Sequence, residues 1–467
     1  MATAKFLDGD LMRHVVVMSL SASLGLVSVF LVDFADLYFI SLLGEEALAA
    51  AVGFAGTLIF FVFSATIGLA IAMGALTAPK IGRGETDDAR LVATSVMVFG
   101  FVVTFILAFI FWIWAEQLLS ILGAEGVTLA YATRYLRIVL PSIPISAIAI
   151  MASALLRAHG DARRAMIVTF WSGGVNAVLD PLLIFGVGLG LDGAAYASVA
   201  ARFAMALAAL RAVNRNYDGF ATCRFGALLS HLPLIIAIAA PAVLTNIATP
   251  LGSGIVTRAV APFGDAAVAG FAVVSRLTPL FFCVIFALSG AVGPIVGQNF
   301  GARKFDRVQG TLTRSLQFVA GYTVIAWVLL LAVHNFASEQ FGLTGEGKRV
   351  VFWFALVAAP LFFFNGLLFV ANAAFNNLKR PIWSTFLNWG RNTIGVLPFV
   401  VLGADIGGAP GVLIGQALGG VVFGVLGFFL ARRLVSGYAE GRLDPEKGWS
   451  FPLMRSRPDP PFSSPRG

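Results

Sequence analysis

Twelve long apolar stretches set the narrowest limit on what this chain can fold into. A helix that crosses a lipid bilayer needs about 20 mostly apolar residues, and each stretch reaches that length. Runs such as 58–63 are apolar on every face, whereas the strands of a membrane β-barrel alternate lipid-facing and polar positions. The sequence therefore predicts an all-α polytopic membrane protein with twelve transmembrane helices. The stretches are 15–43, 47–78, 88–115, 128–156, 163–189, 193–215, 231–262, 265–299, 307–335, 348–377, 381–405 and 409–435.

The composition excludes the common soluble classes. The chain is 58% hydrophobic and 12% charged, whereas ordinary soluble proteins are about 25% charged. The two cysteines, Cys223 and Cys283, provide neither a disulfide framework nor the spacing of metal ligands. No G-x-x-x-x-G-K-[ST] phosphate loop is present, which argues against direct use of ATP. We expect a protein that is not an enzyme and carries no cofactor.

The basic residues predict the orientation of the chain. Most of the 32 lysines and arginines fall in the loops and ends on one side of the predicted spans. Cytoplasmic loops carry such an excess, so both termini are predicted to be cytoplasmic and the location to be the cell (inner) membrane. The formal charge of +8 then reflects membrane topology, and we expect no nucleic-acid partner.

A weak internal repeat divides the chain into two halves. Gly82 matches Gly301, and Pro141 matches Pro360, at similar positions relative to their spans. Six spans per half return the chain to its starting side, so both halves enter the membrane in the same direction, as in parallel-repeat transporters. We expect two pseudo-symmetric six-helix lobes with a substrate cleft between them. The predicted parts are a cytoplasmic N-terminus (1–14), an N-lobe (15–215), a linker (216–230), a C-lobe (231–435) and a disordered cytoplasmic tail (436–467).

Three aspartates lie where lipid disfavours charge. Asp33 and Asp36 fall in the first predicted span and Asp180 in the fifth, and a carboxylate at mid-bilayer costs roughly 2.5–3.5 kcal/mol. Asn176 lies four residues before Asp180, on the same helix face. Pro181 has no N–H to donate and leaves a backbone carbonyl free one turn back. These oxygens could hold Na⁺ or a proton. Alternatively, the aspartates lie at span ends, and Asp33 belongs only to a polar face.

A second polar series lies in the tenth and eleventh spans. It consists of Asn365, Asn372, Asn388 and Arg391. A guanidinium inside a membrane protein needs a partner or a water-filled cavity, and asparagines also hydrogen-bond helices together. Two interpretations follow: these residues line the substrate cleft, or they hold the C-lobe helices together.

Four segments resemble the signatures of the multidrug and toxic compound extrusion (MATE) transporters of bacteria and archaea. They are DLYFISLLG at 36–44, LLRAHGD at 155–161, NAVLDPLLIFG at 176–186 and PIVGQNFGA at 294–302. Their order and spacing match the family, and the similarity extends over residues 15–435. The resemblance implies two six-helix lobes, a monomer, and export of small organic, often cationic, compounds in exchange for Na⁺ or H⁺.

The resemblance also implies a site in the N-lobe. The family's cation site carries over to Asp36, Asn176 and Asp180, and a fourth position, usually threonine, falls near Ser198. Asp33 is an additional carboxylate. Span seven has Thr245 and Asn246 where some branches have an acid, and the span-ten motif ends in Lys379 and Arg380, so no second cation site is expected in the C-lobe.

Two other functions were weighed against export. A flippase for a lipid-linked precursor has a related two-lobed fold, but it would need a cleft rich in arginine and lysine. An intramembrane prenyl transferase would use Asp33 and Asp36 as part of a Mg²⁺ motif, but it requires a second acidic cluster that the sequence lacks. An ion-coupled exporter remains the leading interpretation.

Overall fold

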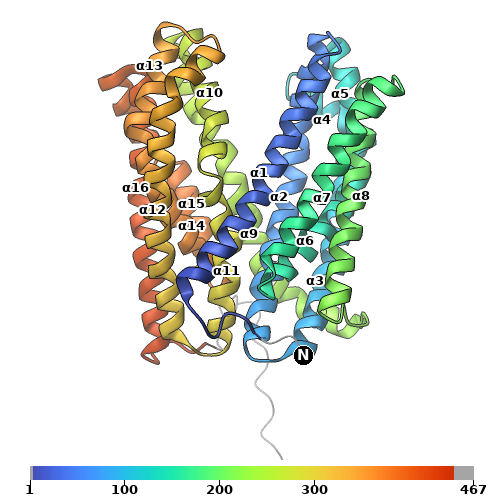
Figure 1. Ribbon diagram of the computed structural model, residues 1–467, viewed down its shortest axis with the longest axis vertical. Helices are drawn as coiled ribbons and strands as arrows, with labels where there is room; N and C mark the ends of the chain where they lie inside the picture. Colours follow the sequence, from blue (N-terminus) through green and yellow to red (C-terminus); the bar gives the residue numbers. More distant parts are fainter. Residues whose placement is uncertain (1–3, 446–467) are drawn as a thin grey trace, which may run out of the picture.

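The computed structural model describes residues 4–445, and in this range helices joined by turns and loops are the regular secondary structure. The predicted tail lies largely outside this range. Figure 1 shows the first half of the chain on one side and the second half on the other. The ribbons of the two halves approach each other at the end where the N-terminus lies and spread apart at the opposite end. We call these the inner and outer ends.

The first half forms the N-lobe. Its helices are α1 (Leu11–Ser41), α2 (Glu46–Gly82), α3 (Thr86–Ile113), the short α4 (Ala115–Ile121), α5 (Gly126–Val139), α6 (Ile143–Ala158), α7 (Ala162–Pro181) and α8 (Leu191–Asn216). A 3₁₀ turn joins α5 to α6, so these two helices make one crossing of the membrane. A π-helical turn, Leu182–Gly186, extends α7 beyond Pro181.

The second half forms the C-lobe. Its helices are α9 (Phe225–Val260), α10 (Asp265–Phe281), α11 (Cys283–Gly301), α12 (Phe305–Gln340), α13 (Gly345–Trp353), α14 (Ala359–Asn377), α15 (Ile382–Asn392) and α16 (Leu397–Ala439). The pairs α10–α11 and α13–α14 each make one crossing. The helix α16 doubles back at Gly408, whose φ of 62° is left-handed, so it contributes to two crossings. The part of the chain that the structure describes thus makes twelve crossings in two lobes, as predicted.

The longest interruption of a predicted span lies in the eleventh stretch. The stretch 381–405 was expected to be a single helix, but α15 ends at Asn392 and helix resumes only at Leu397. The break lies where the returning half of α16 comes very close, because a Cβ on Gly419 would fall 1.7 Å from the carbonyl oxygen of Gly395. Gly395 and Gly419 thus allow the backbones of the eleventh and twelfth crossings to approach closely. The helix of the eleventh crossing is interrupted at this contact.

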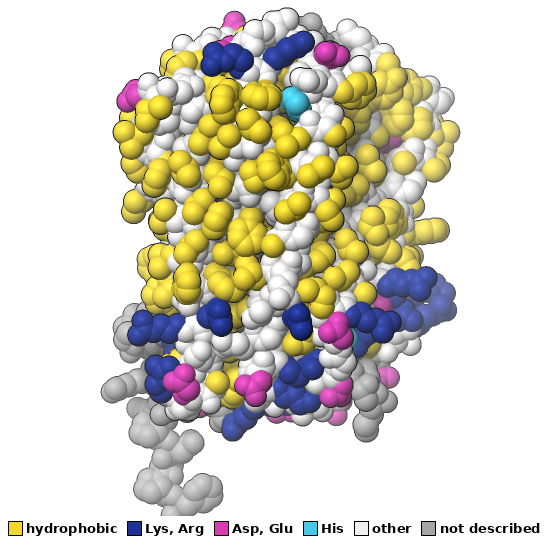
Figure 2. Space-filling view, turned by 60° about the vertical axis from the view of Figure 1, so that its left-hand side comes forward, with side chains coloured by type: hydrophobic (Ala, Val, Ile, Leu, Met, Phe, Trp, Pro, Cys, Tyr) yellow, Lys and Arg dark blue, Asp and Glu magenta, His cyan; other side chains and the backbone are white. Residues whose placement is uncertain are grey.

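The surface of the bundle suits a bilayer. Hydrophobic side chains cover the middle of the face in Figure 2, and Lys and Arg side chains gather in a band toward its lower part. Many large apolar side chains are exposed, including Phe105, Phe109 and Leu207 at 52%, 53% and 67%. Such a surface would aggregate in water and is stable in lipid. The chain is therefore a multi-pass membrane protein.

The two lobes are held together at the inner end. The helix α2 packs against α9 and α11, and α1 packs against α11. The N-terminal segment adds links to both lobes: Lys5 Nζ donates to the carbonyl of Gly160 at 3.0 Å, and the Phe6 N–H donates to Gln298 Oε1 at 2.9 Å. Gln298 Nε2 in turn donates to the carbonyl of Ala158 at 2.7 Å. This end of the cleft is closed.

Candidate functional site

Three of the polar residues singled out from the sequence meet between α1 and α7. The amide of Asn176, oriented with its nitrogen toward the carboxylates, donates to Asp36 Oδ1 at 2.9 Å and to Asp180 Oδ2 at 3.1 Å. One nitrogen thus bridges the two helices and places the two carboxyl groups around a single point. Asn176 and Asp180 share a face of α7 because they are four residues apart, and the packing of α1 along α7 supplies Asp36.

The bridged pair has unused ligand capacity. Asp180 is fully buried, and its Oδ1 atom has no hydrogen-bond partner among the described residues. A buried carboxylate oxygen without a partner is costly, and a bound cation or proton would satisfy it. The two carboxylates supply oxygen atoms of the kind that a hard monovalent cation prefers as ligands. The residues present therefore fit Na⁺ or H⁺, the two ions left open from the sequence.

The other two predicted residues lie on the same cavity. A cavity of about 370 Å³ opens inside the N-lobe between α1, α6, α7 and α8, and its lining includes Asp33, Asp36, Asn176 and Ser198. Asp33 lies one turn from Asp36 along α1 and faces this cavity, so it belongs to the same chamber as the bridged pair. Ser198 enters from α8, beside the buried Tyr135.

Arg202 is part of this chamber and was missed from the sequence. Its Nη1 atom donates to the carbonyl of Val139 at 3.1 Å and to Ser142 Oγ at 2.8 Å, and its guanidinium lies 5.7 Å from the centre of the Phe63 ring. It is close enough to attract the carboxylates of both Asp33 and Asp36. The available signal was an arginine four residues after Ser198, inside the predicted span 193–215.

The C-lobe residues form a separate network. Asn388 Nδ2 donates to Asn372 Oδ1 at 3.1 Å, and the Arg391 guanidinium donates to Asn365 Oδ1. Both bonds join α14 to α15, and all three asparagines are buried. None of the four residues lines the cavity around Asp36. These hydrogen bonds between α14 and α15 fit the interpretation that the four residues hold the C-lobe helices together. Their role in substrate binding stays a prediction.

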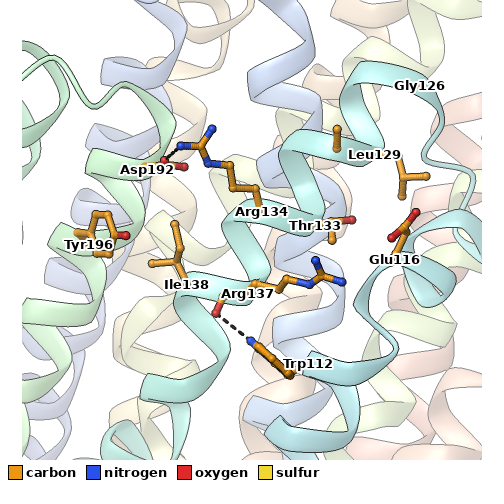
Figure 3. Close-up of a pocket in the computed structure, with 11 residues that line it drawn as sticks. Trp112, Glu116, Gly126, Leu129, Thr133, Arg134, Arg137, Ile138, Asp192 and Tyr196 are labelled. Carbon is orange, nitrogen blue, oxygen red and sulfur yellow. Dashed lines mark hydrogen bonds and ion pairs between the residues drawn. The ribbon is translucent and has the colours of Figure 1, made fainter.

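A second cavity, of about 610 Å³, lies toward the outer end between α3, α4, α5 and α8. In Figure 3, Arg134 points toward Asp192, with which it forms an ion pair, and Trp112 donates to the backbone carbonyl of Arg137 at 3.2 Å. The cavity contains none of the residues predicted for the site. Its charged groups are partly paired with each other, and we assign no function to it.

The fold and the chamber define a two-lobed membrane transporter rather than an enzyme. The model of the MatE family matches residues 22–182 and 241–402, one segment in each half. Together these segments cover more than half of the chain, and the chain belongs to the MATE family of multidrug and toxic compound transporters. The internal repeat seen in the sequence corresponds to these two matches.

Individual relatives agree with this family. The chain is 27% identical to the FAD transporter of Shewanella oneidensis over 437 residues, which cover 92% of this chain and 96% of the relative. It is 26% identical to the multidrug export protein MepA of Staphylococcus aureus over 322 residues, 68% of this chain and 70% of MepA. The bent form of the Vibrio cholerae MATE transporter VcmN has the same fold, with a TM-score of 0.86, 23% identity and coverage of 92% and 98%.

Proposed function

We propose that the protein is a cation-coupled antiporter that exports organic, cationic compounds in exchange for Na⁺ or H⁺. The observation that carries this proposal is the Asn176 amide that bridges Asp36 and Asp180. Acidic groups are expensive inside a membrane and are kept where they bind an ion or a substrate. Here they are held together, and one carboxylate oxygen still lacks a hydrogen-bond partner within residues 4–445.

Alternating access would couple the ion to the substrate. The lobes are joined at the inner end and spread at the outer end, which is the arrangement of a state open to the outside. A cation entering from outside would bind between α1 and α7 and favour one arrangement of the lobes, and substrate would favour the other. One elementary charge moving through 100 mV supplies about 2.3 kcal/mol, enough for a useful gradient of exported compound.

The charge of the chamber supports organic cations as substrates. Asp33 and Asp36 line this part of the cavity, and Asp180 is bridged to Asp36. The guanidinium of Arg202 attracts the carboxylates of Asp33 and Asp36, so carboxylates outnumber guanidinium groups here. A flavin nucleotide is the second candidate, because a relative that aligns over 92% of this chain is an FAD transporter. The acidic chamber disfavours any pyrophosphate, FAD included. A flippase is the weaker alternative, because neither relative named above is described as one. We place the protein in the inner membrane as a monomer with both termini in the cytoplasm.

Transport by the purified protein in proteoliposomes tests the proposal. Ethidium, FAD and a lipid-linked sugar are offered in turn, with Na⁺ and H⁺ gradients imposed separately. We expect ethidium movement driven by one of the two gradients. Asp36→Asn and Asp180→Asn should each abolish the driven movement, and Asp306→Asn, the same change at an exposed carboxylate of α12, should not. Driven transport that survives in both chamber variants would reject the coupling role.

A further inference from the structure

The chamber around Asp36 continues along the inside of the N-lobe toward the inner end. Its lining on α7 includes Ala162, Ala165, Thr169, Ser172 and Asn176, which are spaced three or four residues apart and therefore share one face of the helix. From the first to the last of these is 14 residues, or about 21 Å at 1.5 Å per residue. The cavity thus extends from the carboxylates to the first turn of α7.

Hydroxyl groups line this extension on several helices. Ser21 and Ser28 come from α1, Ser146 and Ser153 from α6, and Thr169 from α7. The Ser153 hydroxyl is buried and has no hydrogen-bond partner among the described residues. A buried hydroxyl that faces a cavity is ordinarily satisfied by water. Water molecules and these hydroxyl oxygens would together solvate a small cation along the whole cavity, from Asp36 to the inner end.

Arg157 stands at the inner end of this row. It lies in the last turn of α6 and lines the same cavity. Within residues 4–445, no carboxylate, carbonyl or hydroxyl pairs with its guanidinium, so its positive charge acts on the cavity without compensation. A cation that descends from Asp36 would meet this charge before it reached the inner solution.

The position of Arg157 depends on the other lobe. A Cβ on Gly290 of α11 would lie 4.0 Å from Nε of Arg157, so a C-lobe helix covers the guanidinium. The next residue, Ala158, accepts the inter-lobe hydrogen bond from Gln298 at 2.7 Å. When the lobes part at the inner end, Arg157 loses this cover and becomes hydrated, and its effect on a nearby cation is screened.

We propose that this hydroxyl-lined cavity is the path by which the coupling cation leaves the N-lobe, and that Arg157 is the charge barrier that closes the path while the lobes are joined at the inner end. Arg157 binds neither substrate nor ion in this role. It prevents the ion from crossing without exported compound. The inference rests on the proposed coupling to Na⁺ or H⁺.

Ion leak in the absence of any exported compound tests the barrier. Proteoliposomes with an imposed Na⁺ or pH gradient and no ethidium should leak roughly tenfold faster with Arg157→Gln than with the unmodified protein, because a charge barrier has been removed. Arg157→Lys keeps the charge and should leak no faster than the unmodified protein. Arg163→Gln, the same change at an exposed arginine two residues into α7, is the matched control. Equal leak in the Gln and Lys variants would overturn the barrier.

Cysteine labelling tests the path without reference to transport. In a chain with Cys223 and Cys283 replaced by serine, Ser153→Cys should react with a small neutral thiol reagent added at the inner end and more slowly with a cationic reagent of similar size. Arg157→Gln should remove the difference. Ser315→Cys, fully buried in the C-lobe, is the control and should react with neither. A Ser153→Cys chain that is inert to both reagents would refute the path.

The two experiments separate this inference from the proposed function. A protein that exchanges ethidium for an ion, yet shows no leak with Arg157→Gln and no labelling at Ser153→Cys, would keep the proposed function and lose the path. If no gradient drives transport, the proposed function fails. If Arg157→Gln does not fold, the Ser153→Cys variant that retains Arg157 still tests the path, because its reaction rates with the neutral and the cationic reagent can be compared.

Discussion

Gly82 of α2 and Gly301 of α11 occupy reciprocal positions at the contact between the two lobes. A Cβ on Gly82 would lie 2.0 Å from the carbonyl oxygen of Gln298, and a Cβ on Gly301 would lie 2.0 Å from the carbonyl oxygen of Pro79. The two glycines match in the internal repeat of the sequence. The repeat therefore places equivalent backbones against each other at the closed inner end.

Alanine at Gly301 should weaken this closure. The added methyl group would force α2 and α11 apart, and overpacking of this kind costs about 1–3 kcal/mol. We expect a lower midpoint of thermal unfolding in detergent and greater access of a thiol reagent to a cysteine placed at Ser289 on α11. Gly321→Ala in α12 is the matched control, because a Cβ there meets nothing within 4 Å. Unchanged stability and labelling in Gly301→Ala would contradict the reciprocal contact.

Loss of the bridging amide should change the affinity for the coupling ion, in a direction that depends on which ion it is. Asn176→Leu removes the donor to both Asp36 and Asp180 and leaves their carboxylates without the group that holds them together. If the coupling ion is Na⁺, the concentration that gives half-maximal ethidium transport should rise at least roughly tenfold, because hydrogen bonds to charged groups are lost. If the ion is H⁺, that concentration should fall, because the amide stabilises the charged carboxylates and its loss favours the protonated form. Asn372→Leu makes the same change in the C-lobe network and should leave that concentration unchanged. An equal effect of both variants would show that Asn176 has only a structural role.

The sequence predicted the membrane crossings more completely than the arrangement of the polar residues in the chamber. Apolar length identifies membrane helices directly, and helical spacing alone places Asn176 beside Asp180. The arrival of Asp36 next to them depends on how α1 packs against α7, which no local pattern contains and which only the family resemblance implied. The interruption after Asn392 was missed because it follows from a close backbone approach between Gly395 and Gly419, two residues that are distant in the chain.

Isolated charges were the least predictable feature. Arg202 has no carboxylate within helical reach in its own span, so the sequence offers no partner for it, and its contacts with Val139 and Ser142 come from another helix and the turn beside it. The surroundings of Arg157 were also unpredictable, because they come from another lobe. In the sequence this arginine stood out only as part of a motif that resembles the family's. For Asn365 and Arg391 the sequence left two interpretations open, and the bond between them is one that joins helices.

Removal of the Arg202 charge should tighten ion binding. Arg202→Gln leaves Asp33 and Asp36 without the guanidinium that attracts them, so the chamber becomes more negative and holds a cation more strongly. The half-maximal concentration of the coupling ion should fall roughly tenfold, and turnover should slow because release is harder. Flux measurements over a range of ion concentrations check both effects.

Two controls accompany the Arg202 measurement. Arg211→Gln changes an exposed arginine of the same helix and should have no effect. Ser142→Ala removes one hydrogen bond of Arg202 but keeps its charge, so it should alter ion affinity much less than Arg202→Gln. A weaker apparent affinity in Arg202→Gln would mean that the guanidinium supports the ion site and does not compete with the ion.

The loop between α6 and α7 should make stability depend on pH. Burial lowers the pKa of His159 to about 4, well below its ordinary value of about 6.5, and the ring stacks on Tyr217 at a centroid distance of 4.2 Å. The unfolded chain therefore binds more protons than the folded protein between these two values, and stability rises with pH across that window. Between pH 7 and pH 5 the expected loss is about 2 kcal/mol.

Asp161 in the same loop titrates below that window and does not obscure the test. Burial alone would raise its pKa, but hydrogen bonds from the side chain and backbone of Arg164 and from the Tyr217 hydroxyl outweigh burial and lower the pKa. The stability that Asp161 contributes is present above its ordinary pKa of about 3.9 and is lost as the pH falls through the lower folded value. Thermal unfolding in detergent at pH 7, 6 and 5 should therefore show a decline that His159→Gln reduces and that His334→Gln, near the outer end of α12, leaves intact. A decline of equal size in all three proteins would assign the pH dependence to other groups.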